Sequence, residues 1–103
     1  MKPDQLLHPT PKGLYCPPGD FYIDPVAPVE TALVTHGHAD HARPGNHTVW
    51  ATQQTIDIMG IRYGANFCDR AHAAPLREMF SINGVTVGFW PAGHVLGSAQ
   101  ILV

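Results

Sequence analysis

The chain has 103 residues, a length that allows one domain at most. Hydrophobic residues make up 45% and charged residues 14%, which is typical of a globular protein and excludes a disordered one. No apolar run reaches the roughly 18 residues of a membrane-spanning helix. The formal net charge of -2 excludes a surface that binds nucleic acid through positive charge alone, so any phosphate chemistry would need another cation.

The N-terminus lacks the long apolar core and the small-residue cleavage site of a signal peptide, which predicts a cytoplasmic protein. The two cysteines, Cys16 and Cys68, lie far apart and form no C-x-x-C pair. This spacing argues against a disulfide framework and against a zinc ribbon. We therefore interpret both as ordinary thiols in the core or at the surface.

The first third of the chain predicts short strands separated by turns. Residues 14–16 and 21–23 are strand-like and flank a Pro-Pro-Gly-Asp turn, which predicts a hairpin. Residues 31–35 have an uninterrupted apolar centre, which predicts a strand that is covered on both faces. Such strands usually belong to layered α/β folds.

The middle of the chain predicts one strand and one helix. Residues 48–51 form a short strand pattern, and Thr52 can cap a helix over residues 53–63. One packing stripe of this helix consists of Ile56, Met59, Gly60 and Tyr63. Residues 64–78 show no clear period, which predicts mostly loop.

The last third predicts a second hairpin. Residues 80–82 and 85–89 alternate around Asn83-Gly84, a strong short-range hairpin signal. Residues 99–103 begin a further strand, and the chain stops within it. Because a strand without a terminating turn or a partner is a poor place for a domain to end, we expect the chain to be the N-terminal part of a larger domain.

Seven histidines, ten glycines and ten prolines indicate metal ligands mounted on tight turns. Three of the histidines and one aspartate form the pattern H-x-H-x-D-H: His36, His38, Asp40 and His41. Random placement of this chain's residues would give the pattern in roughly two of a thousand chains. Ligands two residues apart do not share a helix face, but they project to one side at the end of a strand.

The donor types at residues 36–41 suit a catalytic metal centre. Imidazole nitrogen binds zinc and neighbouring first-row ions, and an added carboxylate also suits manganese or iron. Four ligands within six residues exceed what one open catalytic ion takes from such a short segment, which favours two adjacent ions. The alternative is a closed, purely structural site, but structural zinc sites are typically rich in cysteine and this segment has none.

Two residues outside the motif are further candidates. His94 follows a strand pattern and stands among small residues, as expected of a positioned ligand. Asp24 follows residues 21–23 and could orient a metal-bound histidine, or it could serve only in an Asp-Pro turn. The remaining histidines fall outside any pattern and are interpreted as solvated or locally bonded: His8, His47 and His72.

The H-x-H-x-D-H loop after an apolar strand, followed by a Gly-His ligand after a hairpin, resembles the metallo-β-lactamase superfamily of binuclear metallohydrolases. The strings at residues 14–25, 38–45 and 91–99 are similar to the bacterial ligase-associated DNA exonucleases, relatives of the β-CASP nucleases that process RNA 3′ ends. The resemblance implies an α/β fold, part of a metallo-β-lactamase-type αββα sandwich, with mainly its first β-sheet and one helix. Residues 1–103 would be an incomplete N-terminal part of that domain.

The resemblance also implies two divalent ions, zinc or manganese. His36, His38 and His94 would bind the first ion, while Asp40 and His41 would bind the second and form the catalytic pair. Asp24 would support the ligands without binding an ion. In the family, a hydroxide shared by the two ions attacks phosphorus while the ions neutralise the phosphate oxygens.

By this resemblance the whole protein would be a hydrolase of DNA repair, a metal-dependent exonuclease that acts on DNA rather than RNA. It would work with a DNA ligase and a helicase and without a membrane. Family members continue to further metal ligands and an inserted domain, so we expect the 103 residues alone to be inactive. The alternatives are an RNA-processing nuclease, a small-ester or thioester hydrolase of the same superfamily, or an inactive histidine-rich metal-binding module.

Overall fold

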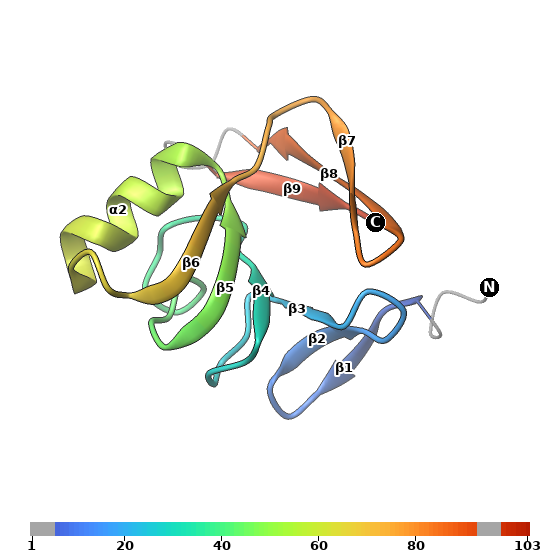
Figure 1. The fold of residues 1–103 in the computed structure, drawn as a ribbon, viewed down its shortest axis with the longest axis horizontal. Helices are drawn as coiled ribbons and strands as arrows, with labels where there is room; N and C mark the ends of the chain where they lie inside the picture. The colour runs from blue at the N-terminus through green and yellow to red at the C-terminus, as the bar shows by residue number, and fades with distance from the viewer. Residues whose placement is uncertain (1–5, 93–97) are drawn as a thin grey trace.

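The computed structural model describes residues 6–92 and 98–103, which form two β-sheets and one complete helix (Figure 1). The larger sheet has the strand order β1 (His8–Thr10), β2 (Gly13–Cys16), β3 (Phe21–Ile23), β4 (Thr31–Leu33), β5 (Asn46–Ala51) and β6 (Cys68–Ala73). The smaller sheet has the order β7 (Met79–Ile82), β8 (Val85–Pro91) and β9 (Ala99–Leu102). The helix is α2 (Gln53–Tyr63). No helix among the described residues has the length and apolar character to cross a membrane.

The prediction of an α/β fold forming part of an αββα sandwich is wrong. Of the described residues, 44% are strand and 13% are helix, which makes this a small β-rich domain. Among the described residues, α2 is the one complete helix, and none covers the smaller sheet. The physical reason is that a helical period occurs over residues 53–63, whereas most of the remaining sequence consists of short runs interrupted by Gly and Pro.

The predicted hairpin of residues 14–16 and 21–23 is confirmed as β2 and β3. These strands are antiparallel, with Tyr15 opposite Tyr22, and the Asp20 N–H closes the turn on the Cys16 carbonyl at 2.8 Å. The Tyr15 hydroxyl donates a 2.8 Å hydrogen bond to Asp20 Oδ1. Because that bond stabilises the protonated phenol beside a carboxylate, it raises the pKa of Tyr15.

Strands β3 to β6 are parallel neighbours, so their carboxyl ends lie at one edge of the larger sheet. The register places Tyr22 beside Ala32 and Ala32 beside Val49. The segments that follow β3 and β4 therefore begin next to each other. β6 corrects a second prediction, because residues 68–73 pair with β5 where the sequence predicted loop.

Helix α2 covers one face of the larger sheet and has the predicted bounds. Thr52 is its N-cap and accepts a hydrogen bond from the Thr55 N–H at 3.3 Å, and Gly64 ends it at φ +91°. The buried cluster on this face consists of Val34, Ala42, Val49, Ala51, Met59 and Phe67. The predicted stripe is confirmed in large part, since Met59 is buried and Ile56 and Tyr63 pack against the cluster.

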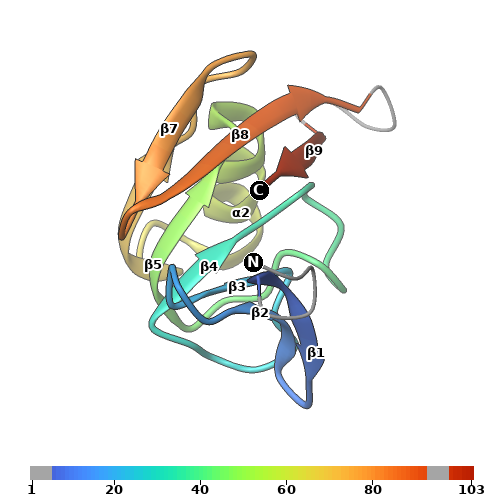
Figure 2. The same ribbon diagram turned by 90° about the vertical axis from the view of Figure 1, so that its right-hand side faces the viewer.

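The smaller sheet packs on the opposite face of the larger one (Figure 2). Successive strand residues point to opposite faces, so Val49 joins the cluster under α2 while Trp50 packs against the cluster between the sheets. That inter-sheet cluster contains Phe21 and Leu33 from one sheet and Val87 and Phe89 from the other. The larger sheet is therefore the middle layer.

The Asn83-Gly84 hairpin is confirmed between β7 and β8. Both turn residues have positive φ angles, +50° and +83°, as a two-residue type I′ turn requires. The Asn83 side-chain amide also donates a 2.6 Å hydrogen bond to the Gly19 carbonyl, which follows β2. The turn thus connects the two sheets.

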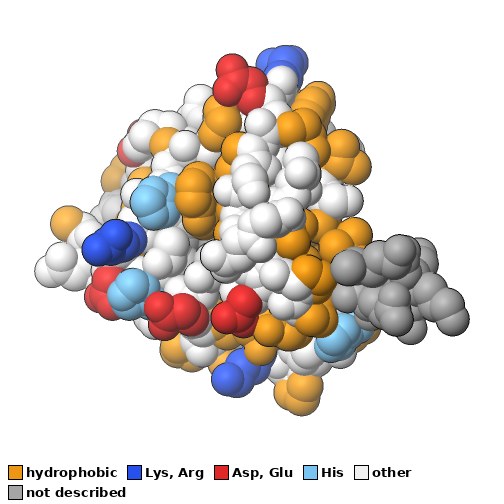
Figure 3. Space-filling model, turned by 45° about the vertical axis from the view of Figure 1, so that its right-hand side comes forward, with side chains coloured by type: hydrophobic (Ala, Val, Ile, Leu, Met, Phe, Trp, Pro, Cys, Tyr) orange, Lys and Arg blue, Asp and Glu red, His pale blue; other side chains and the backbone are white. Residues whose placement is uncertain are grey.

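Charged side chains are interspersed on the molecular surface. On the face drawn in Figure 3, Lys and Arg side chains are scattered and stand near Asp and Glu, with hydrophobic side chains between them. This distribution agrees with the net charge of -2. The face shown has no concentrated basic patch.

Replacing Gly60 by alanine is expected to raise the free energy of unfolding by about 1 kcal/mol, because glycine is the poorer helix former. A Cβ at Gly60 would meet nothing within 4 Å. Urea denaturation measures the change. The matched control is Gly84→Ala, which also has open space but stands at φ +83°, so it should lose about 1 to 2 kcal/mol. A loss of stability in Gly60→Ala would contradict the assignment of helix interior.

Candidate metal centre

The candidate site lies where β3 and β4 end. Asp24 directly follows β3, and its N–H donates to the Leu33 carbonyl of β4 at 2.9 Å. Its φ of +47° lies in the left-handed region, which aspartate tolerates better than most residues. Thr35 and His36 follow the end of β4. The parallel pairing of β3 and β4 therefore brings Asp24 next to residues 35–36, eleven positions later in the chain.

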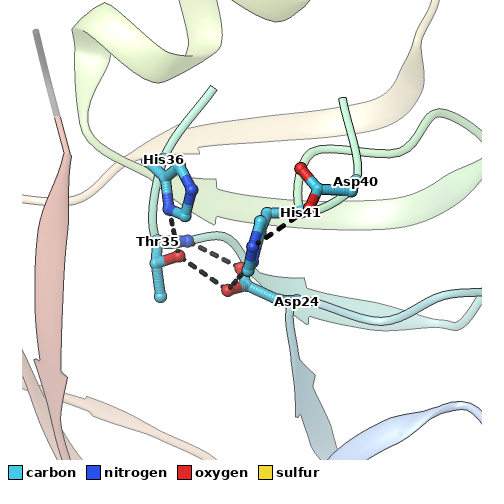
Figure 4. Close-up of polar contacts among 5 residues, drawn as sticks. All are labelled: Asp24, Thr35, His36, Asp40 and His41. Carbon is cyan, nitrogen blue, oxygen red and sulfur yellow. Dashed lines mark hydrogen bonds and ion pairs between the residues drawn. The ribbon is translucent and has the colours of Figure 1, made fainter. Parts of the chain in front are cut away.

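Asp24 holds Thr35 through two hydrogen bonds (Figure 4). The Thr35 N–H donates to Asp24 Oδ1 at 2.8 Å, and the Thr35 hydroxyl donates to Asp24 Oδ2 at 2.6 Å. A hydroxyl has a single proton. In this arrangement the Thr35 oxygen can interact with a third group only as an acceptor.

That third group is His36. Its Nδ1 lies 2.8 Å from the Thr35 hydroxyl oxygen. Because the hydroxyl proton already points to Asp24, Nδ1 must carry the proton of this contact and donate it. With Nδ1–H donating, Nε2 is the ring nitrogen through which His36 could bind a metal ion.

His41 is fixed in the same way by the same carboxylate. Its Nδ1 lies 2.9 Å from Asp24 Oδ2, an oxygen that can only accept, so Nδ1–H donates and Nε2 is the ring nitrogen through which His41 could bind an ion. His41 Nε2 lies 3.5 Å from Asp40 Oδ2. Two ligands about 2.1 Å from one ion, at angles between a right angle and the tetrahedral angle, stand about 3.0 to 3.5 Å apart. Asp40 and His41 therefore fit as ligands of a common ion.

The imidazoles form a compact group. The ring centroids of His36 and His41 are 4.2 Å apart, and those of His36 and His38 are 4.9 Å apart. Ligand atoms of Asp24, His36 and His41 all lie within 4.8 Å of one another. The structure thus gathers four residues of the motif, and it adds Asp24 to them.

Asp24 is better suited to orient ligands than to bind an ion. Its two oxygens accept three hydrogen bonds, two from Thr35 and one from His41. Its side chain is 16% exposed, against 73% for Asp40. Among the described contacts, the exposed Asp40 carboxylate has no comparable set of hydrogen bonds. It is therefore more available than Asp24 to bind an ion. Sequence reasoning alone left Asp24 between an orienting role and a turn role, and its observed contacts are those of an orienting residue.

The loop that carries the motif is anchored on both sides. The N–H groups of His41 and Ala42 both donate to the His38 carbonyl, at 2.9 and 2.8 Å, which turns the chain back toward Asp24. Ala42 is fully buried in the cluster under α2. Asn46 ends the loop, since its side chain accepts from the Val29 N–H at 2.9 Å.

His94 lies outside the described residues, so its predicted metal contact stays a prediction. The described residues on either side of residues 93–97 lie near the site. Ala92 N–H donates to the Ser98 carbonyl at 3.1 Å, and Ala99 N–H donates to the Thr35 carbonyl at 2.7 Å. Thr35 is therefore bonded to the strand that follows this segment.

Sequence reasoning missed two residues of the site. Thr35 could have been found, because a hydroxyl directly before the first motif histidine, at a strand end, is placed to bond a neighbouring ring. Arg62 could not have been found from the sequence pattern. It comes from α2 and donates a hydrogen bond to the carbonyl of Gly37, which is 25 positions earlier.

The donor set fits zinc or manganese. It combines imidazole nitrogens whose Nδ1–H groups are occupied by hydrogen bonds with an exposed carboxylate, and such pairs suit both ions. The ligand atoms of Asp24, His36 and His41 lie together, and His38 and Asp40 stand beside them as the further candidates of the motif.

No protein-family model matches the chain. Over 94 residues the chain is 31% identical to a protein of Opitutus terrae named as a probable DNA ligase. The matched region covers 88% of this chain and 9% of that protein. The chain therefore spans less than a tenth of the length of this curated relative.

Proposed function

We propose that this chain carries the metal-binding segment of a metal-dependent phosphodiester hydrolase that acts on DNA, in keeping with its resemblance to ligase-associated DNA exonucleases. The observation that supports it best is the double use of Asp24. One carboxylate bonds Nδ1 of His41 directly and Nδ1 of His36 through the Thr35 hydroxyl. Such an arrangement fixes the orientation of both rings through Nδ1, as partners of metal-binding histidines do.

Each residue has a role in this proposal. His36 and His38 bind one ion, with His94 as the predicted third ligand, while Asp40 and His41 bind a second. When bound, the ions supply a water of lowered pKa and positive charge opposite the phosphate oxygens. Asp24 holds the tautomer of His41 by a direct hydrogen bond and that of His36 through the Thr35 hydroxyl. The protein side chains thereby keep the ligand geometry fixed before substrate arrives.

One comparison supports DNA as the substrate, and the charge of the chain is compatible with it. The similarity to a protein named as a probable DNA ligase associates the segment with DNA metabolism. The chain has a net charge of -2 and scattered basic side chains on the face of Figure 3, so bound divalent ions are its natural source of positive charge for phosphate. We propose DNA repair beside a DNA ligase as its setting.

The test uses the complete product of the gene. Purified protein is incubated with end-labelled single-stranded DNA in manganese or zinc, and products are separated by length. We expect stepwise shortening that stops with a chelator and falls at least 100-fold in His36→Ala, because each metal ligand is needed for the charge at phosphorus. The matched control is His47→Ala. His47 Nδ1 lies 2.9 Å from the Thr48 hydroxyl oxygen, and His47 is not part of the cluster, so this variant should leave cleavage unchanged.

Other outcomes identify the alternatives. Faster shortening of RNA of the same sequence would favour an RNA-processing nuclease, and hydrolysis of a thioester without DNA cleavage would favour a small-ester hydrolase. A second candidate rests on the similarity to the probable DNA ligase: the segment would serve a ligase without hydrolysing DNA. Joining of nicked DNA without metal-dependent shortening would support that candidate and overturn ours.

A further inference from the structure

Helix α2 reaches the motif loop at one defined point. Arg62, in the last turn of α2, donates a hydrogen bond to the carbonyl oxygen of Gly37. Gly37 stands between His36 and His38, and it is buried while His38 is exposed. A residue of the helix is thus bonded to the backbone unit between two candidate metal ligands.

The same helix also packs against Gly37. A Cβ built on Gly37 would lie 2.9 Å from Ile58 Cγ2 and 3.1 Å from Ile58 Cδ1, closer than side chains normally approach. Gly37 is absent from the residues with positive φ. A side chain at position 37 would therefore force Ile58 to move, so the proximity of Ile58, and not the backbone angles, favours glycine here.

Fixing Gly37 fixes the two histidines beside it. Glycine has more backbone freedom than any other residue, so a loop with Gly37 at its centre can turn His36 and His38 in many relative directions. The Arg62 bond holds the carbonyl, and contact with Ile58 restricts the Cα. His36 is also held at Nδ1 by Thr35, and the Arg62 bond restrains the peptide unit that joins His36 to His38.

We propose that Arg62 and Ile58 form a clamp, the α2 clamp, that positions His36 and His38 for metal binding. This inference rests on the proposed function, and it makes Arg62 a positioning residue that acts through the Gly37 peptide. The competing role for Arg62 is purely helical. A cation in the last turn stabilises the helix dipole, and its guanidinium also lies 5.7 Å from the Tyr63 ring.

The first experiment separates these roles. Arg62→Met removes the donor and the charge, Arg62→Lys keeps a charged donor, and Arg70→Met is the matched control on exposed β6. Titration calorimetry of the complete gene product with zinc or manganese measures affinity, and circular dichroism at 222 nm measures helix content. We expect affinity to fall about tenfold or more in Arg62→Met, as for other residues that orient ligands, with substantial recovery in Arg62→Lys and no change in Arg70→Met.

The second experiment tests the clamp from the other side. Gly37→Ala should weaken metal binding because its Cβ collides with Ile58, and Gly37→Ala combined with Ile58→Ala should regain part of the affinity because the collision is removed. The single variant Ile58→Ala is the reference for the double variant. Rescue of this kind does not follow from loss of folding, because the second substitution by itself removes packing.

The outcomes keep the two proposals apart. If the complete gene product without substitutions binds neither ion, the proposed function fails. If it binds an ion and Arg62→Met binds it equally well, or loses only helix content, the α2 clamp is overturned while the metal centre stands. Gly37→Ala with unchanged affinity would also overturn the clamp.

Discussion

Replacing Asp24 by asparagine is expected to weaken zinc or manganese binding by about 10- to 100-fold while the fold is retained. The Asp24 carboxylate accepts hydrogen bonds from Thr35 and from His41 Nδ1. An asparagine amide has one acceptor oxygen and one donor nitrogen. When its oxygen takes the Oδ1 position and keeps the bond from the Thr35 N–H, its NH₂ takes the Oδ2 position and faces both the Thr35 hydroxyl and His41 Nδ1, which must then accept. The His41 proton moves to Nε2 and blocks the electron pair that would bind the ion.

The backbone gives no reason for Asp24→Asn to unfold the protein. The residue has φ +47°, and asparagine occupies this left-handed region at least as readily as aspartate. Calorimetric titration measures the affinity, and nitrogen chemical shifts of the histidine rings report which ring nitrogen carries the proton. Unchanged affinity together with a His41 proton still on Nδ1 would contradict the orienting role.

A second variant tests the contact between Asp24 and His36 through Thr35, and a third serves as its control. Thr35→Val removes the hydroxyl between Asp24 and His36, so it should change the tautomer of His36 and leave that of His41 unchanged. Asp57→Asn is the control, because this exposed carboxylate bonds Gln53 on the surface of α2. It should alter neither tautomer and should not alter metal affinity.

Replacing Phe21 by alanine is expected to lower the free energy of unfolding by about 3 to 5 kcal/mol, a large part of the total stability of a domain this size. Phe21 is fully buried in the cluster between the sheets, where it joins Leu33, Val87 and Phe89. A Cβ on Gly19 would lie 2.4 Å from the Phe21 ring, so the surrounding chain is already in close contact with it. Truncation leaves a cavity that such close packing cannot fill.

Urea denaturation measures this loss, and Ile61→Ala is the control. Ile61 lies on α2 and is 87% exposed, so its replacement should change stability by less than about 0.5 kcal/mol. Equal losses in the two variants would mean that the sheets do not pack through Phe21. Since Asp24 follows the strand that Phe21 begins, the Phe21 variant should also bind metal more weakly as the strand end becomes mobile.

Features that depend on neighbouring residues could be predicted from the sequence. The helix over residues 53–63 follows from its period and from the Thr52 cap, and the hairpin follows from Asn83-Gly84 at positions that need positive φ. The H-x-H-x-D-H motif is local in the same sense, because its spacing already limits where the side chains can point.

Features that depend on distant residues were decided by the tertiary structure. β6 has a largely exposed, non-alternating pattern, so main-chain pairing with β5, which leaves no trace in side-chain type, is what forms the strand. The prediction of an αββα arrangement was wrong for a related reason. The layers of a fold depend on which sheet and helix faces pack together, and those contacts join distant residues. Asp24 meets His41, 17 positions away, because β3 and β4 run parallel, and Arg62 meets Gly37 because α2 packs over that loop. The sequence by itself determined which groups could bind a metal, and the packing of strands and helix decided which groups hold them in place.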